Sequence, residues 1–265
     1  EYGIKVRTNS HGTFGPEIEK DIPIILQLGD SYTAGPGIPY EKNYPFLLQE
    51  KITAKNQKKY QTVILGMGGS SPLQQKYIFE RKLPELKPEY VIYELYANDP
   101  RDDYSFNYSN YMAKMTTYEQ FPKWFLNTAI GDRVYTLLSD AASKKNEEIY
   151  NSTTDTVEND PAKIWNELTR PSLEAIKQEA ERRGAQFYLF NIPLGWEFDN
   201  EYATKSAEPR LKQNEFALEW SKEHNVPFVD LYETFLASNS AQLNELYLDG
   251  DHGFHLTEKG AEIAA

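Results

Sequence analysis

Short apolar runs that alternate with helical patterns are the feature that most limits how this chain can fold. Five runs have the length of a strand: 22–29, 62–66, 90–97, 185–193 and 226–232. Four segments space their apolar residues as a helix does: 44–55, 71–86, 162–184 and 210–225. Such alternation favours βαβ units, in which helices cover both faces of a parallel sheet. The pattern predicts an α/β fold that binds its ligand at the carboxyl ends of the strands.

One segment interrupts this rhythm. Residues 101–162 are rich in Tyr, Asn and Asp, and contain a helical-looking stretch at 128–145. With 265 residues and 40% hydrophobic content, the chain can bury one large core. We therefore expect a single domain over residues 1–265 with an insertion at 101–162. The insertion is either a cap over the site or a surface excursion without function, and its tyrosines either stack on sugars or pack against the body.

Charge and cysteine content exclude several classes of function. The net charge of −12 argues against binding nucleic acid or an anionic membrane, which requires clustered Lys and Arg. An uncharged or cationic small molecule or carbohydrate is the expected partner. The chain has no cysteine, so disulfides, thiolate nucleophiles and cysteine metal sites are excluded, while the cellular compartment stays open.

Histidine is scarce, so few residues can serve as a general base near neutral pH. Of the four histidines, His224 ends a charged helical stretch and His11 lies in a turn-like "TNSHGTFG". Both have simple structural explanations, since a helix dipole favours a cation at its carboxyl end. The other two share the loop "YLDGDHGFHLTEKG" near the end of the chain.

That loop places His252 and His255 beside Asp249 and Asp251. Two carboxylates next to two imidazoles suit a base that is held in place by an acid, although a solvated turn is the simpler alternative. A metal site is less favoured, because no second His or Cys cluster completes a zinc site and the EF-hand acid pattern is missing. We expect no metal and no cofactor.

Three further residues follow predicted strands and could carry acyl-transfer chemistry. Ser31 lies in "LQLGDSYTAGPG" directly after the first apolar run. A serine hydroxyl becomes a good nucleophile only when a neighbouring base takes its proton. The developing oxyanion also needs donors, which the "GMGGSS" loop around Gly69 and the amide of Asn98 could supply. Each residue taken alone is equally well explained as part of a turn.

Four separated motifs, in order, resemble those of the SGNH (GDSL-type) hydrolase family: "LGDSYTAGPG", "ILGMGGSSPLQQ", "YELYANDPRDD" and "HLTEKGAEIAA". The earlier "RTNSHGTFGPE" is similar to an Asn-x-x-Gly-x-x-Gly lead-in of one bacterial branch. The resemblance covers the chain from Arg7 onward except the insertion. It implies a flavodoxin-like three-layer α/β/α sandwich with a central parallel sheet, no cofactor, and hydrolysis or transfer of ester-linked acyl groups.

The resemblance also implies roles for individual residues. Ser31 would be the nucleophile and His255 the base. The oxyanion hole would consist of the Ser31 N–H, the Gly69 N–H and the Asn98 amide. The family suggests a bacterial protein, exported or tethered to a membrane, while the oligomeric state and the natural acyl group stay open.

Two departures from the family pattern affect the site. Tyr96 stands where the third motif usually has glycine, which would narrow the pocket or reshape the turn. The last motif usually has aspartate three residues before its histidine, but here His252 precedes His255 at that distance. Either Asp251 or Asp249 orients His255, or the working pair is Asp249 and His252. We prefer His255, because "HLTEKG" has the expected glycine and helix start, and we choose Asp251 as its acid.

These features together predict a serine esterase that removes ester-linked acyl groups, including acetyl groups on carbohydrate, with a Ser-His-Asp site. One alternative keeps the fold and changes the acceptor, as in a polysaccharide O-acetyltransferase. Another is a non-catalytic carbohydrate-binding relative with a decayed site.

Overall fold

The computed structural model describes residues 7–82, 86–96, 99–108, 160–198, 213–238, 245–248 and 255–265, with scattered positions between 121 and 144. Its strands are β1 (Ile24–Gly29), β2 (Gln61–Gly66), β3 (Pro88–Leu95), β4 (Gln186–Asn191) and β5 (Phe228–Asp230). All neighbouring strands pair in parallel, in the order β2-β1-β3-β4-β5. This is the strand order of flavodoxin-like folds, in which the ligand lies where the order reverses, at the carboxyl ends of β1 and β3.

Helices follow the strands as the alternating pattern predicts. The α-helices are α1 (Ser31–Ala34), α2 (Tyr44–Asn56), α3 (Pro72–Lys82), α4 (Asp99–Tyr108), α8 (Pro161–Ile164), α9 (Arg170–Arg182), α11 (Tyr232–Ser238) and α12 (Glu258–Ala264). A helix also covers 213–223. Short 3₁₀ turns occupy Tyr40–Lys42 and Gly195–Phe198, and a π-helical turn, Trp165–Thr169, joins α8 to α9.

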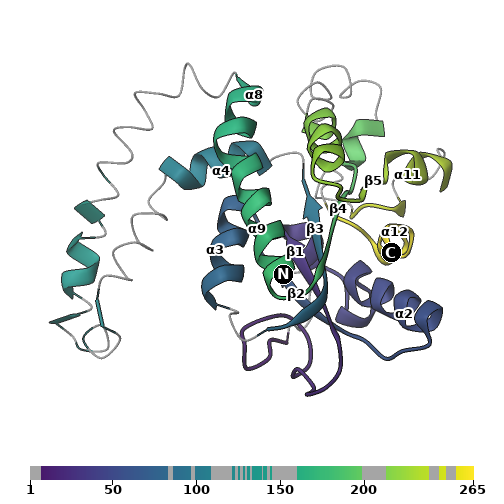
Figure 1. Ribbon diagram of the computed structural model, residues 1–265, viewed down its shortest axis with the longest axis horizontal. Coiled ribbons are helices and arrows are strands. Elements are labelled where there is room, and N and C mark those ends of the chain that lie inside the picture. The colour runs from purple at the N-terminus through teal and green to yellow at the C-terminus, as the bar shows by residue number, and fades with distance from the viewer. Residues whose placement is uncertain are drawn as a thin grey trace.

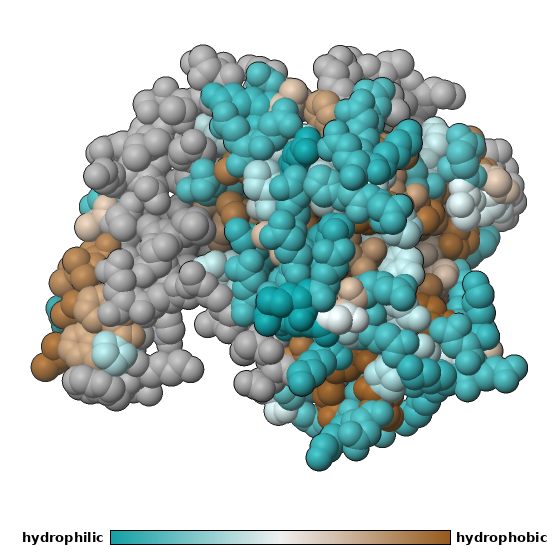
Figure 2. Space-filling model, viewed as in Figure 1, coloured by the Kyte–Doolittle hydropathy of each residue, from teal (hydrophilic) through white to brown (hydrophobic). Residues whose placement is uncertain are grey.

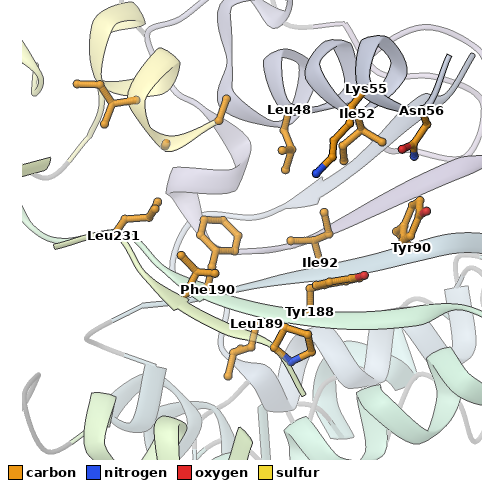
Figure 3. Close-up of a pocket in the computed structure, with 15 residues that line it drawn as sticks. Leu48, Ile52, Lys55, Asn56, Tyr90, Ile92, Tyr188, Leu189, Phe190 and Leu231 are labelled. Carbon is orange, nitrogen blue, oxygen red and sulfur yellow. The ribbon is translucent and has the colours of Figure 1, made fainter. Parts of the chain in front are cut away.

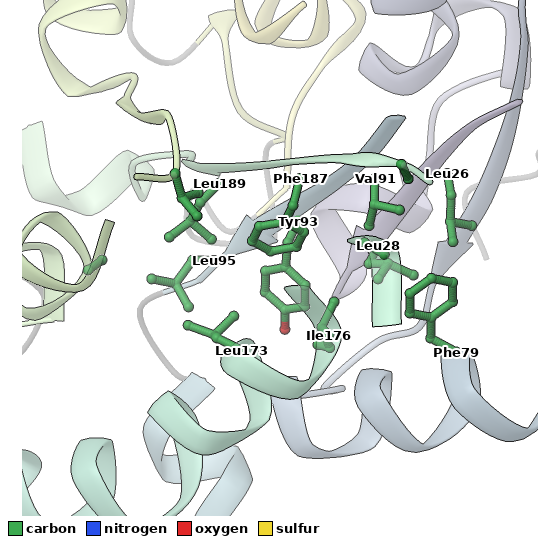
Figure 4. Packing of buried hydrophobic residues seen from close by; sticks show 14 of the residues in the cluster. Leu26, Leu28, Phe79, Val91, Tyr93, Leu95, Leu173, Ile176, Phe187 and Leu189 are labelled. Carbon is green, nitrogen blue, oxygen red and sulfur yellow. The ribbon is translucent and has the colours of Figure 1, made fainter. Parts of the chain in front are cut away.

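Alternate residues of each strand point to opposite faces of the sheet and form two cores. On β1, Leu26 and Leu28 belong to the core beneath α3, α9 and the helix at 213–223, whereas Ile25 belongs to the core beneath α2, α11 and α12. Figure 4 shows the first core, where Leu173 and Ile176 of α9 face the sheet. The chain is therefore a three-layer α/β/α sandwich, as expected (Figure 1).

The lead-in motif covers the edge of the sheet. Buried Asn9 donates to Thr13 Oγ1 at 2.7 Å and accepts from the N–H of Thr13 at 3.2 Å. This turn presents Phe14, whose N–H donates to Ile64 O on the edge strand β2 at 3.1 Å. The motif thus protects an otherwise exposed strand edge.

Helix α4 begins at Asp99, just before the segment at 101–162, and extends into it. The described positions between 130 and 141 are helical, as the sequence predicts, and this short helix lies apart from the sheet (Figure 1). Ile130 and Leu137 are 72% and 66% exposed, and Figure 2 shows hydrophobic residues gathered there. Its role as an insertion or cap stays a prediction. In the described part of the chain, no helix is long and apolar enough to cross a membrane.

Candidate active site

The turn after β1 places Ser31 at the carboxyl edge of the sheet. Asp30 is buried and caps α1, because its side chain accepts a hydrogen bond from the Tyr32 N–H at 2.8 Å. Ser31 is the first residue of α1 and is partly exposed. Its carbonyl accepts from the Gly35 N–H at 2.9 Å, which closes the short helix. The Asp30 cap before Ser31 and the hydrogen bond from Gly35 to the Ser31 carbonyl therefore fix the backbone on both sides of the Ser31 hydroxyl.

The glycine-rich loop after β2 lies beside this turn. A Cβ on Gly66 would collide with the backbone of Thr33 and Ala34, so glycine is required for this close approach. A Cβ on Gly68 would lie 3.9 Å from Ser31 Cβ. The loop at 66–71 is therefore a neighbour of Ser31, as the resemblance implies.

Three hydrogen bonds join the loop to the end of β1. The Gly29 carbonyl accepts from the Met67 N–H at 3.3 Å, from Ser70 Oγ at 3.0 Å and from Gln75 Nε2 at 2.7 Å. Gln75 also donates to Ser70 Oγ at 2.6 Å, and both side chains are fully buried. Neither Ser70 nor Gln75 was identified from the sequence, although both belong to the quoted motif "GMGGSSPLQQ".

Gly69 has a backbone that suits its expected role as a donor. Its φ of +67° lies in the left-handed region, which side chains other than glycine rarely adopt. No atom lies within 4 Å of the position that a Cβ would take, and the residue is exposed. The loop therefore turns here and leaves open space above Gly69.

The third motif follows β3. The Tyr96 N–H donates to Asp99 Oδ2 at 2.8 Å, and the Asp99 N–H donates to Tyr96 O at 3.0 Å. Gln213 Nε2 also donates to Tyr96 O, at 2.5 Å. These bonds hold Tyr96 and Asp99, the described residues on either side of Asn98. Asn98 itself lies outside the described residues, so its place in the oxyanion hole stays a prediction.

His255 lies three residues before the last helix, as the motif predicts. Its carbonyl accepts from the Leu248 N–H at 2.8 Å, and Thr257 caps α12. Gly260 packs against Leu246 O, where a Cβ would collide. The other three candidates of this loop, Asp249, Asp251 and His252, lie outside the described residues, so the choice of acid and base stays a prediction.

An aromatic row connects the first, third and last motifs. The Tyr32 ring lies 4.7 Å from the Tyr96 ring and 5.8 Å from the His255 ring, measured between centroids. Tyr96, the departure from the family glycine, is thus 6% exposed and packed on the residue that follows Ser31. Tyr32 was not identified from the sequence, where its position next to the nucleophile was the only available signal.

The contacts of His224 and His11 explain these two histidines as structural residues. His224 stacks on Trp220 with 4.9 Å between centroids, and its Nε2 lies 3.3 Å from Glu174 Oε1. His11 is exposed in the lead-in turn, where its N–H donates to Asn9 Oδ1. Both positions agree with the structural explanations given above.

Four buried carboxyl groups lie beneath this edge of the sheet: Asp30, Glu94, Asp99 and Asp103. Burial raises the pKa of Asp30 to about 7 and that of Asp103 to about 6. Burial also raises the pKa of Glu94 and of Asp99 well above the ordinary range, and the negative charge of Asp30 adds to both shifts. Among the described residues, no group of three or more His, Asp or Glu side chains could hold a metal ion.

A separate apolar cavity of about 440 Å³ opens on the α2 face of the sheet. Figure 3 shows Leu48 and Ile52 of α2 opposite Tyr188 and Phe190 of β4, and the end of α12 forms another wall. The candidate residues Ser31, Gly69 and His255 do not line it. The cavity is therefore distinct from the site at the carboxyl edge.

Comparison with known proteins agrees with this fold. Residues 28–263 match the GDSL-like Lipase/Acylhydrolase family. An acetyl xylan esterase, AlAXEase, superposes with a TM-score of 0.53 at 15% identity, covering 91% of this chain and 96% of that one. A lipase/acylhydrolase from Enterococcus faecalis superposes with a TM-score of 0.50 at 16% identity, covering 91% of both chains.

A putative lipolytic protein of the G-D-S-L family from Desulfitobacterium hafniense has a TM-score of 0.50 at 13% identity, covering 91% of this chain and 94% of that one. No curated protein sequence matches this chain. At these identities the solved structures establish the fold, and the family match, which spans most of the chain, establishes membership. The chain belongs to the GDSL-like lipase/acylhydrolase family and is an SGNH-type hydrolase.

Proposed function

We propose that this hydrolase is a serine esterase that removes short acyl groups, including acetyl groups on carbohydrate, through Ser31, His255 and Asp251. The observation that carries the proposal is the convergence of motifs at one sheet edge: the loop of Gly69 is bonded to the residue two before Ser31, and the ring of His255 contacts the residue after it. Two features support the substrate class. The fold resembles that of an acetyl xylan esterase, and the charge of −12 favours uncharged or cationic substrates over anionic ones.

The proposed reaction has two halves. His255 accepts the proton of Ser31 Oγ while this oxygen attacks the ester carbonyl carbon, and Asp251 holds the imidazole in the required tautomer. The N–H groups of Ser31 and Gly69 and the amide of Asn98 stabilise the oxyanion. The imidazolium then protonates the leaving alcohol as the C–O bond breaks. Water, deprotonated by His255, releases the acyl group and restores Ser31.

Turnover of p-nitrophenyl acetate tests the nucleophile. Ser31→Ala should lower kcat by about 10³-fold or more, since the attacking atom is removed. Ser238→Ala is the matched control, because this serine lies at the end of α11 and bonds only to Phe235 O among the described contacts. Full activity of a folded Ser31→Ala protein would refute the assignment.

Separate alanine substitutions of the two loop histidines decide between the candidate bases. We expect His255→Ala to abolish turnover and His252→Ala to reduce it weakly. If only His252→Ala is inactive, the working pair is Asp249 and His252. Product analysis in the presence of a sugar acceptor distinguishes hydrolysis from acetyl transfer, and a failure of Ser31 to react with a fluorophosphonate would indicate a non-catalytic relative.

A further inference from the structure

Glu94 lies directly beneath the nucleophile turn, although the proposed mechanism gives it no role. It belongs to β3, is completely buried, and its Oε2 accepts from Thr33 Oγ1 at 3.1 Å and from the Asp30 N–H at 3.4 Å. A Cβ on Gly29 would lie 2.7 Å from this same oxygen. The Glu94 carboxyl group therefore contacts residues that precede Ser31 in the sequence, Gly29 and Asp30, and one that follows it, Thr33.

The contact between the Glu94 and Asp30 side chains requires a proton. Burial raises the pKa of both groups, and because the two carboxyl groups are hydrogen-bonded to each other, the pair holds a proton. Only a protonated carboxyl group can donate. In the described part of the chain, neither group forms an ion pair that would favour its charged form.

Among the described residues, the titratable groups that face this pair are acidic or neutral. Tyr44 from α2 bonds to Thr33 Oγ1 at 2.6 Å. Tyr93 of β3 and the acids Asp99, Asp102 and Asp103 of α4 are further titratable neighbours within the described part of the chain. The negative charge of Asp102 raises the pKa of Asp30 further and so favours retention of the shared proton.

We propose that Glu94 is a positioning residue for the nucleophile: its carboxyl group holds the Asp30 N–H and the Thr33 hydroxyl, which fixes the turn from Gly29 to Ser31 and so directs the Ser31 hydroxyl. The inference rests on the proposed function, because it assigns a support to that nucleophile. Catalysis is sensitive to such support, since a misplacement of about 1 Å can cost about 100-fold in rate.

Two substitutions of Glu94 test the pair. Glu94→Gln keeps an oxygen that accepts from Thr33 and an N–H that donates to Asp30, so we expect kcat to fall by no more than about 2-fold. Glu94→Ala removes both, and we expect kcat and the rate of Ser31 phosphonylation to fall by about 10- to 100-fold, with KM nearly unchanged. Gln27→Ala is the matched control, because Gln27 is equally buried on β1 and donates only to Pro45 O among the described contacts.

A folded Glu94→Ala protein with wild-type kcat would overturn the inference, and so would a loss of kcat as large in Gln27→Ala. If Glu94→Ala does not fold, Thr33→Val decides, because it deletes the hydrogen bond to Glu94 together with the one to Tyr44. We expect it to lower kcat at least about 3-fold, while Thr62→Val, a buried threonine bonded to Ile25 O on β1, leaves kcat unchanged. Equal kcat values in the two valine variants would contradict the role of Glu94.

The retained proton gives a readout that does not depend on activity. At pH 7, folding of the wild-type protein should take up one proton more than folding of Glu94→Gln. The difference is measured from the pH dependence of the urea midpoint of each protein. If both proteins take up the same number of protons on folding, the inference that the pair holds a proton is wrong. Ser31→Ala separates the two hypotheses: if it stays active, the proposed function fails, whereas an inactive Ser31→Ala beside a fully active Glu94→Ala rejects only the role of Glu94.

Discussion

Gly69 offers the sharpest single-residue test of the site. Its φ of +67° disfavours any side chain, yet a Cβ there would meet no atom within 4 Å. Gly69→Ala should therefore fold with a loss of about 1–2 kcal/mol, caused by backbone strain alone. If its N–H donates to the oxyanion, the strained turn and the new methyl group should also lower kcat by about 10-fold or more. Urea denaturation and ester turnover measure the two effects.

Gly184 provides the control for this substitution. It has φ of +83°, a Cβ there would likewise meet no atom within 4 Å, and it follows α9, far from the nucleophile in sequence. Gly184→Ala should lose similar stability and keep its kcat. Equal catalytic losses in the two variants would show that strain, rather than the oxyanion hole, explains the effect at Gly69.

At the scale of elements, the site depends on the bond between the end of β1 and the start of α3. Gln75 of α3 donates to Gly29 O and to Ser70 Oγ, so it holds the loop at 66–71 against the nucleophile turn. Gln75→Ala should lower kcat by about 10-fold and lower the urea midpoint, because it leaves buried polar groups without a partner.

The matched control is Gln61→Ala. Gln61 also donates to backbone carbonyls, those of Glu19 and Ile22, but it lies at the amino end of β2, opposite the loop. This variant should lose stability and retain kcat. Wild-type turnover by Gln75→Ala would mean that the loop keeps its position without the bond to β1.

The elements also show what the sequence could predict. Five apolar runs correctly predicted five parallel strands, since buried strands need continuous apolar residues. The fifth strand, β5, is shorter than the predicted run of 226–232, because it pairs with β4 over only three residues.

The sequence did not identify Glu94, because one carboxyl group inside the apolar run "YVIYELYA" gives no local signal. Its partners Asp30 and Thr33 lie more than 60 residues away, so only the fold reveals the pair.

For the whole molecule, the buried acids make stability depend on pH in an unusual direction. Asp30 and Asp103 have pKa values of about 7 and about 6, above the value of 3.8 for an unfolded Asp. Their contribution to stability is complete below pH 3.8 and is lost as pH rises through 6 and 7. Glu89 and Glu179, which are partly exposed, affect the pH dependence of stability in the opposite direction. Lys58 lowers the pKa of Glu89, and Arg182 lowers the pKa of Glu179. Their smaller contribution is lost only as pH falls below about 4.5.

These opposing effects predict maximal stability at about pH 4 rather than at neutral pH. Between about pH 5 and pH 8 the urea midpoint should fall, with each retained proton contributing up to about 1.4 kcal/mol per pH unit. The net charge of −12 adds self-repulsion in the same direction. Asp103→Asn should flatten this fall, because its amide oxygen can still accept from the Leu73 N–H and its NH2 group can donate to the Thr169 hydroxyl, with no proton to lose. A midpoint that rises over the same pH interval would show that the buried carboxyl groups ionise at little cost.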